Sequence, residues 1–76
     1  MTHRTLDARH LLCPMPVIRT QKAVAELVPG DTLEVRATDP GTLHDVPAWC
    51  RVHGHEVVST ERTDDEIRVT VRIKGT

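Results

Sequence analysis

Residues 67–74 alternate strictly between aliphatic and polar side chains. The aliphatic positions are Ile67, Val69, Val71 and Ile73, and the polar positions between them are Arg68, Thr70, Arg72 and Lys74. Because successive side chains of a strand point to opposite faces of a sheet, this pattern predicts a strand with one buried and one solvated face. We therefore expect every helix of the chain to pack on the same face of one sheet.

Hydrophobic spacing and turn residues divide the chain into elements in the order β-α-β-α-β-β. The expected strands cover residues 4–7, 32–38, 56–62 and 66–74, and the expected helices cover residues 16–28 and 42–53. Pro29-Gly30 ends the first helix, and Pro47 indicates that the second starts late or bends. The last two strands should pair as an antiparallel hairpin. The sequence thus predicts an α/β (α+β) fold, a two-layer sandwich with a mixed four-stranded sheet and both helices on one face.

Each expected helix carries an apolar stripe that would pack on the sheet. The stripe of the first comprises Val17, Ile18, Val24, Leu27 and Val28, and that of the second comprises Leu43, Val46 and Cys50. Asp39 or Thr42 is expected to cap the second helix, because their side chains can accept bonds from its free amides.

The chain has 76 residues, which suffices for one small core, so we expect a single domain over residues 1–76. Its net charge is −1, and it has no Tyr, no Phe and one Trp, which argues against direct binding of nucleic acid. The sequence lacks an apolar leader and a membrane span, so we expect no membrane association and a cytoplasmic location. The two cysteines are not in a C-x-x-C pair, and free thiols are expected.

Cys13 stands in the segment Cys-Pro-Met-Pro, directly before the first expected helix. A residue that precedes proline is disfavoured in helical geometry, so Pro14 should hold Cys13 just outside that helix. We expect the N–H groups of Met15, Val17 and Ile18 to be unpaired and to point toward the sulfur. A helix N-terminus of this kind lowers the pKa of a cysteine and stabilises its thiolate.

Three cations near this segment, Arg9, Arg19 and Lys22, could add to that effect and could form a surface for weak, salt-sensitive complexes with proteins. His10 could serve as a base, although a solvated loop histidine is the simpler interpretation. Such a thiol suits exchange chemistry with an electrophilic sulfur. The alternative is that Cys13 is a small buried side chain in a rigid loop.

Cys50 lies on the apolar stripe of the second expected helix, next to Trp49, and we interpret it as a core residue. Together with His44, His53 and His55 it could instead belong to a metal site. Solvated histidines at a helix end explain the same residues better, because an inward-facing Cys50 would be out of reach of an ion.

Six short motifs are spaced along the chain: Leu6-Asp7-Ala8-Arg9, Leu11-x-Cys13-Pro14-x-Pro16, Pro29-Gly30, Asp39-Pro40, Asp45-Val46-Pro47 and Gly54-His55. In this order they resemble the TusA (SirA-like) sulfur-carrier family. The resemblance implies a β-α-β-α-β-β sandwich and a persulfide on Cys13. It further implies a protein sulfur donor, such as a cysteine desulfurase or rhodanese, and a protein acceptor, in transfer RNA thiolation, molybdenum-cofactor assembly or dissimilatory sulfur oxidation.

The chain departs from this family at two positions near the thiol, where relatives commonly have glycine in place of His10 and often glutamate in place of Met15. We expect no cofactor and no metal at Cys13. Two alternatives to a sulfur carrier stay open: a non-catalytic regulatory or interaction module with a rigid Cys-Pro-x-Pro corner, and, less favoured, a metal-binding protein.

Overall fold

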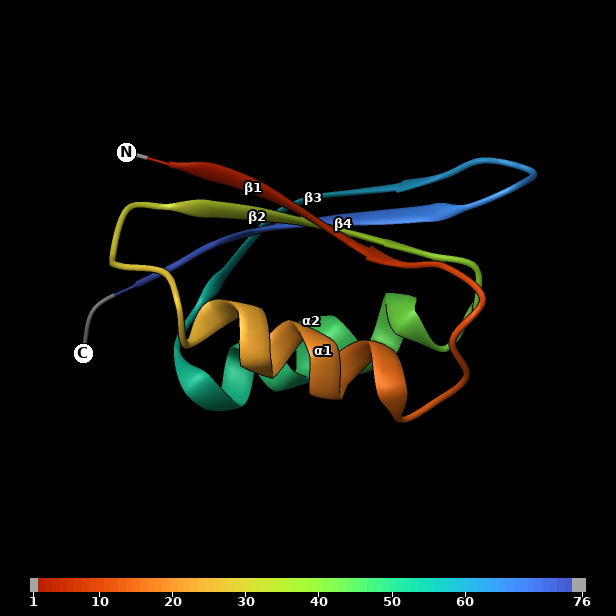
Figure 1. Cartoon of the computed structure of the whole chain (residues 1–76), viewed down its shortest axis with the longest axis horizontal. Helices are drawn as coiled ribbons and strands as arrows, with labels where there is room; N and C mark the ends of the chain where they lie inside the picture. Colours follow the sequence, from red (N-terminus) through yellow and green to blue (C-terminus); the bar gives the residue numbers. More distant parts are fainter. Residues whose placement is uncertain (1, 75–76) are drawn as a thin grey trace.

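The computed structural model describes residues 2–74 and contains all six expected elements in the expected order. They are β1 (His3–Ala8), α1 (Met15–Val24), β2 (Thr32–Ala37), α2 (Thr42–His53), β3 (Glu56–Arg62) and β4 (Ile67–Arg72). The two helices lie next to each other beneath one face of the sheet (Figure 1). The two-layer α+β architecture predicted from the sequence is confirmed.

The sheet has the strand order β1-β2-β4-β3. β1 and β2 run parallel, whereas β4 runs antiparallel to both of its neighbours, so the sheet is mixed. Val35 in β2 lies opposite Leu6 in β1 on one side and Val69 in β4 on the other. The central strands β2 and β4 therefore carry most of the buried surface, while β1 and β3 form the edges.

The alternation in the two central strands determines where the core lies. Leu33 and Val35 in β2, and Val69 and Val71 in β4, are fully buried, as the pattern predicted. Val46 and Cys50 of α2 are also fully buried against this face, and Leu43 packs beside them. The expected stripe of the second helix is thus confirmed.

The buried face of α1 differs from the expected stripe. Val17, Val24 and Leu27 do pack against the core, but Ile18 is 48% exposed and Val28 is 62% exposed, so these two assignments were wrong. The buried positions are instead Pro16, Thr20 and Ala23. Thr20 can be buried because its Oγ1 donates to the carbonyl oxygen of Pro16 at 2.8 Å. Small side chains let the helix approach the sheet closely.

The first helix also ends at Val24, four residues before the expected end. The next amides make tighter i to i−3 bonds, from Glu26 to the carbonyl of Ala23 and from Leu27 to that of Val24. The Asp31 carboxylate, which is buried, then accepts hydrogen bonds from the N–H groups of Val28 and Thr2. The chain thus turns before Pro29 without leaving these donors unpaired.

The second helix has the expected bounds and runs through Pro47 without a break. Asp39 Oδ1 accepts a hydrogen bond from the N–H of Gly41, the N-cap residue, whereas Thr42 Oγ1 has no partner among residues 2–74. Among residues 2–74 no side chain caps the amides of this helix, so the expected cap by Asp39 or Thr42 was wrong, and Asp39 accepts from the Thr42 N–H through its backbone carbonyl. Gly54 ends the helix with a left-handed backbone (φ 78°), which glycine adopts without strain.

The strand bounds differ slightly from those expected: β1 is longer by a residue at each end, and β2 and β4 are shorter. Regular pairing of β4 ends at Arg72, but Ile73 still exchanges backbone hydrogen bonds with the loop before β2. The hairpin of β3 and β4 is antiparallel as expected, with a register shift between Val57 and Ser59.

We predict that Leu33→Ala lowers the free energy of unfolding by about 2–5 kcal/mol, because it leaves a cavity at a fully buried position. Chemical denaturation monitored by circular dichroism measures the change. Val52→Ala is the matched control, since Val52 is 80% exposed and its loss should change stability by less than about 0.5 kcal/mol. Equal effects of the two substitutions would contradict the assignment of the core.

Candidate functional site

Cys13 lies in the connection from β1 to α1 and is exposed. β1 and β2 are parallel neighbours, so their carboxyl ends lie at the same end of the sheet. The connection from β1 to α1 and the connection from β2 to α2 therefore start side by side (Figure 1). Cys13 therefore lies beside the start of α2, which is far away in sequence. As predicted, Cys13 lies outside the first helix, whose N-cap is Pro14.

Two carboxylates contact Cys13, Asp39 from the connection between β2 and α2 and Asp45 from the first turn of α2. The backbone N–H of Cys13 donates to Asp39 Oδ2 at 3.0 Å, and its Sγ–H donates to Asp45 Oδ2 at 3.2 Å. A Cβ atom added at Gly41 would lie 3.4 Å from Asp39 Oδ1 and 3.6 Å from Asp45 Oδ2, so the two carboxylates are close neighbours. Cys13 is thus next to two neighbouring carboxylates.

This environment raises the pKa of the Cys13 thiol above its ordinary value. The main cause is the hydrogen bond to Asp45, which holds the proton on sulfur, followed by partial removal from water and the negative charges of Asp45 and Asp39. The expectation of a lowered pKa and a stabilised thiolate was therefore wrong. The contacts of Cys13 thus favour its protonated form over the thiolate.

The backbone N–H groups at the start of α1 were expected to be unpaired and to stabilise a thiolate on Cys13, but two of them have other acceptors. The N–H of Met15 donates to the carbonyl of Leu12 at 2.8 Å, and that of Ile18 donates to the carbonyl of Pro14 at 3.2 Å. Two of the three donors that we expected to be unpaired are therefore engaged. A helix end whose amides are already satisfied stabilises a nearby thiolate less.

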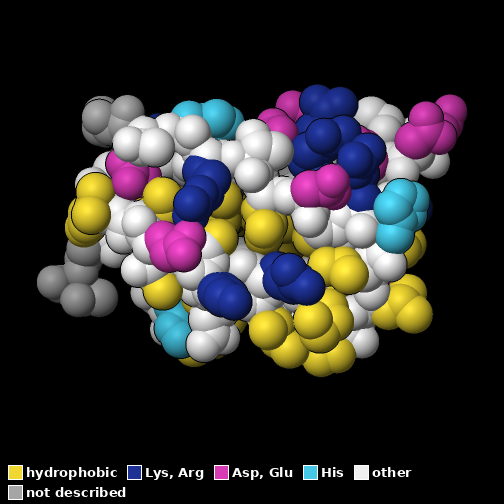
Figure 2. Space-filling model, viewed as in Figure 1, with side chains coloured by type: hydrophobic (Ala, Val, Ile, Leu, Met, Phe, Trp, Pro, Cys, Tyr) yellow, Lys and Arg dark blue, Asp and Glu magenta, His cyan; other side chains and the backbone are white. Residues whose placement is uncertain are grey.

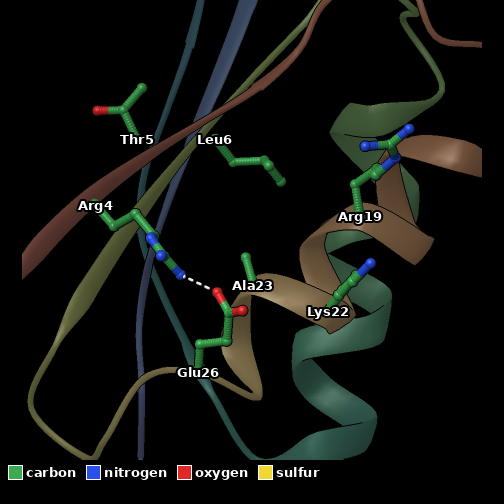
Figure 3. A pocket seen from close by; sticks show the side chains of 7 residues that line it. All are labelled: Arg4, Thr5, Leu6, Arg19, Lys22, Ala23 and Glu26. Atoms are coloured by element: carbon green, nitrogen blue, oxygen red, sulfur yellow. Dashed lines mark hydrogen bonds and ion pairs between the residues drawn. The ribbon is translucent and has the colours of Figure 1, made fainter.

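The three cations lie elsewhere as well. Arg9 forms a two-pronged ion pair with Asp7, at 2.9 and 3.0 Å, which lowers the pKa of that carboxyl far below its ordinary range. Arg19 and Lys22 line an open groove of about 220 Å³ between β1 and α1, where Arg4 is paired with Glu26 (Figure 3). Cys13 does not line that groove, and the charges that shift the pKa of its thiol are those of Asp45 and Asp39, so the expected effect of the cations is not found.

Exposed apolar side chains lie close to Cys13 in the chain. Leu12 is 76% exposed and Ile18 is 48% exposed, and hydrophobic side chains gather on the surface at the start of α1, next to two cationic side chains (Figure 2). Exposed aliphatic groups of this size are typical of surfaces that contact another protein.

His10 was considered as a base, but the group that accepts the hydrogen bond of the thiol is Asp45. His10 itself has a left-handed backbone (φ 67°), and its backbone N–H donates to Thr38 Oγ1 at 2.9 Å. From the sequence, Asp39 was expected to cap the second helix, but neither Asp39 nor Asp45 was expected to contact Cys13. Both stand in motifs of the family resemblance, which was the one signal that pointed to them.

Cys50 is fully buried, and burial raises the pKa of its thiol to about 11, which confirms its interpretation as a core residue. The nearby histidines pack on Trp49: the rings of His53 and His55 lie 4.6 and 5.5 Å from its ring. His55 is half-buried and its Nδ1 accepts a hydrogen bond from the N–H of Lys74, so it is not simply solvated as expected. Within residues 2–74 no three His, Cys, Asp or Glu side chains are grouped as a metal ion would require.

Comparison with known proteins identifies the family of this chain. The family model described as Sulfurtransferase TusA matches residues 4–73. This chain belongs to the TusA family. The family resemblance drawn from the sequence motifs is confirmed.

Three relatives carry the names of candidate sulfur carrier proteins. YrkI of Bacillus subtilis is 48% identical over 82% of this chain and 80% of its own length. A Neisseria meningitidis serogroup A protein is 39% identical over 97% of this chain and its full length. YrkF of Bacillus subtilis is 41% identical over 92% of this chain, but the match spans only 38% of YrkF.

Among solved structures, a SirA-like protein from Desulfitobacterium hafniense has the same fold. Its TM-score to this chain is 0.83 with 28% identity, over 95% of this chain and 99% of that one. Within residues 2–74, neither helix of this TusA family member is long and apolar enough to cross a membrane.

We predict that His10→Gly stabilises the protein by about 0.5–1 kcal/mol, because glycine adopts the left-handed backbone of this position without the strain of a Cβ atom. Thermal and denaturant unfolding measure the gain. His10→Ala is the control: it keeps the Cβ atom and should bring no gain. If the glycine variant were no more stable than the alanine variant, the left-handed conformation of residue 10 would be refuted.

We also predict that the free energy of unfolding falls as the pH drops below 6.5. Burial, and the nearby charge of His53, lower the pKa of His55 from 6.5, so the unfolded chain takes up a proton in a range where the folded protein does not. The pKa values of Asp31 and Glu66 are lowered from 3.8 and 4.5, so they contribute only at lower pH. Denaturant unfolding between pH 5 and 7.5 measures the slope.

The variant His55→Gln should flatten this slope, while His44→Gln, at an exposed position of α2, should leave it in place. A slope that survives in His55→Gln would assign the effect to another group.

Proposed function

We propose that this protein is a sulfur carrier that accepts sulfane sulfur as a persulfide on Cys13 and passes it to an acceptor protein. The observation that carries the proposal is the exposed thiol of Cys13 on the Cys-Pro-Met-Pro corner, in contrast to the buried thiol of Cys50. Membership of the TusA family and the names of the three relatives support it. We treat the whole chain as one carrier domain.

In the loading step Cys13 Sγ attacks the outer sulfur of a persulfide, R–S–SH, on the donor. The bond between Sγ and that sulfur forms, and the sulfur–sulfur bond of the donor breaks. The donor sulfur leaves with the electron pair and gains the proton that Cys13 loses, so the products are Cys13–S–SH and R–SH. No external oxidant or reductant is needed.

In the unloading step a thiolate of the acceptor attacks the outer sulfur of Cys13–S–SH. The bond to Cys13 Sγ breaks, and Cys13 returns to a thiol by taking up the proton released from the acceptor. Both steps require that a second protein reach the sulfur directly. An exposed sulfur meets that requirement without a substrate pocket.

We propose that both partners are proteins that dock on the exposed apolar side chains next to Cys13. Leu12 and Ile18 offer the aliphatic contact area that the centre of a protein interface needs. The donor is proposed to be a cysteine desulfurase or a rhodanese, in the reducing cytoplasm, where the thiols of Cys13 and Cys50 stay free. The relay would supply transfer RNA thiolation, molybdenum-cofactor assembly or dissimilatory sulfur oxidation.

Mass spectrometry of the intact protein tests the proposal. After incubation with a cysteine desulfurase and cysteine, or with polysulfide, the wild type should gain the mass of one sulfur atom, and peptide mapping should place it on Cys13. Cys13→Ser should gain nothing. Cys50→Ala is the matched control and should load as the wild type does, because Cys50 is buried in the core.

An unmodified wild type, or equal loading of wild type and Cys13→Ser, would refute the carrier role.

A further inference from the structure

The thiol of Cys13 and the carboxylate of Asp45 come from different elements and meet at one point of the surface. Sγ–H donates to Asp45 Oδ2 at 3.2 Å, although the two residues are 32 positions apart in the chain. The backbone N–H of Cys13 donates to Asp39, in the connection between β2 and α2, and this bond holds the thiol next to Asp45. The contact is therefore built by the fold and not by local sequence.

Charges that could offset these carboxylates are directed elsewhere. Arg9 is paired with Asp7, and Arg19 and Lys22 line the groove between β1 and α1 with Arg4. His10, in the same connection as Cys13, is bonded through its backbone to Thr38. Asp45 from α2 contacts the sulfur, Asp39 from the connection before it contacts the backbone N–H, and these two acidic groups are the charges that act on the thiol.

A thiol is a poor nucleophile until it loses its proton, since the thiolate is the form that attacks a sulfur atom. A carboxylate that accepts the thiol hydrogen bond and adds a negative charge opposes that loss. A cation placed on the carboxylate cancels the charge and competes for its lone pairs. Asp45 is half-buried and its Oδ2 contacts the exposed sulfur, so its carboxylate is partly open to a protein that docks on Cys13.

We propose that Asp45 keeps Cys13 unreactive in the free protein by accepting its hydrogen bond, and that a sulfur-exchanging partner activates Cys13 by pairing a Lys or Arg side chain with Asp45. This inference rests on the proposed function for the identity of the partners. It adds their chemistry: a true partner carries a cation next to its own reactive cysteine. Proteins or small electrophiles without such a cation exchange slowly, which protects the carrier from unproductive reactions.

The first test measures the rate at which Cys13 reacts with the uncharged disulfide 4,4′-dithiodipyridine, followed by release of thiopyridone across a range of pH. Asp45→Asn should react several-fold faster than wild type at pH 7, with the pH–rate midpoint shifted to lower pH. Asp45→Glu keeps the charge and should stay close to the wild type. Asp65→Asn, an exposed carboxylate in the turn between β3 and β4, is the matched control and should behave as wild type.

The second test uses two activated peptide disulfides, Gly-Cys-Lys and Gly-Cys-Glu, each carrying a thiopyridyl leaving group and blocked ends. The wild type and Asp65→Asn should react several-fold faster with the lysine peptide than with the glutamate peptide at low ionic strength. Asp45→Asn should reduce this ratio toward one, and added salt should reduce it in the wild type.

An unchanged pH–rate midpoint in Asp45→Asn, or a peptide ratio that is the same in Asp45→Asn and wild type, would overturn the inference. Thermal unfolding of each variant verifies that it is folded. Neither test involves transfer of sulfane sulfur, so each can fail while Cys13 still loads a persulfide, and each can succeed while loading fails.

Discussion

The parallel pairing of β1 with β2 is the constraint on which the site depends. The connections that follow these two strands both start at the carboxyl ends of the strands, at the same end of the sheet. Because only one face of the sheet is buried, both helices pack on that face. Cys13 therefore meets Asp39 and Asp45, which are 26 and 32 positions away in sequence. The site is a product of topology, since no residue within either connection could create it alone.

The chemical character of the site follows from that meeting. An exposed thiol bordered by cations would be ionised and reactive toward any electrophile, whereas one bordered by carboxylates keeps its proton. In our proposal such a thiol reacts when a second protein supplies a cation that pairs with Asp45. The apolar side chains of Leu12 and Ile18 offer a place for that protein to bind, and the carboxylate of Asp45 offers a place for it to act.

Features that depend on the periodicity of neighbouring residues could be predicted from the sequence, and the contacts between residues far apart in the chain could not. The alternation of Val69 and Val71 with polar residues gave the buried face correctly, because side-chain direction in a strand is a local property. The end of α1 was missed because the acceptor of the Val28 amide is Asp31, beyond the helix. The pKa of Cys13 was predicted to be lowered, whereas it is raised. The prediction relied on Arg9, which is near in sequence, and could not foresee the contact with Asp45, which is distant in sequence.

The most direct test of this account is an NMR titration of the Cβ carbon of Cys13 in the free, sulfur-free protein. The chemical shift of that carbon reports the change from thiol to thiolate without any reagent, partner or reaction. The account predicts a midpoint above that of the same cysteine in the unfolded chain, and a fall of the midpoint in Asp45→Asn. A midpoint at or below the unfolded value would mean that the carboxylates do not control this sulfur, and would contradict the account.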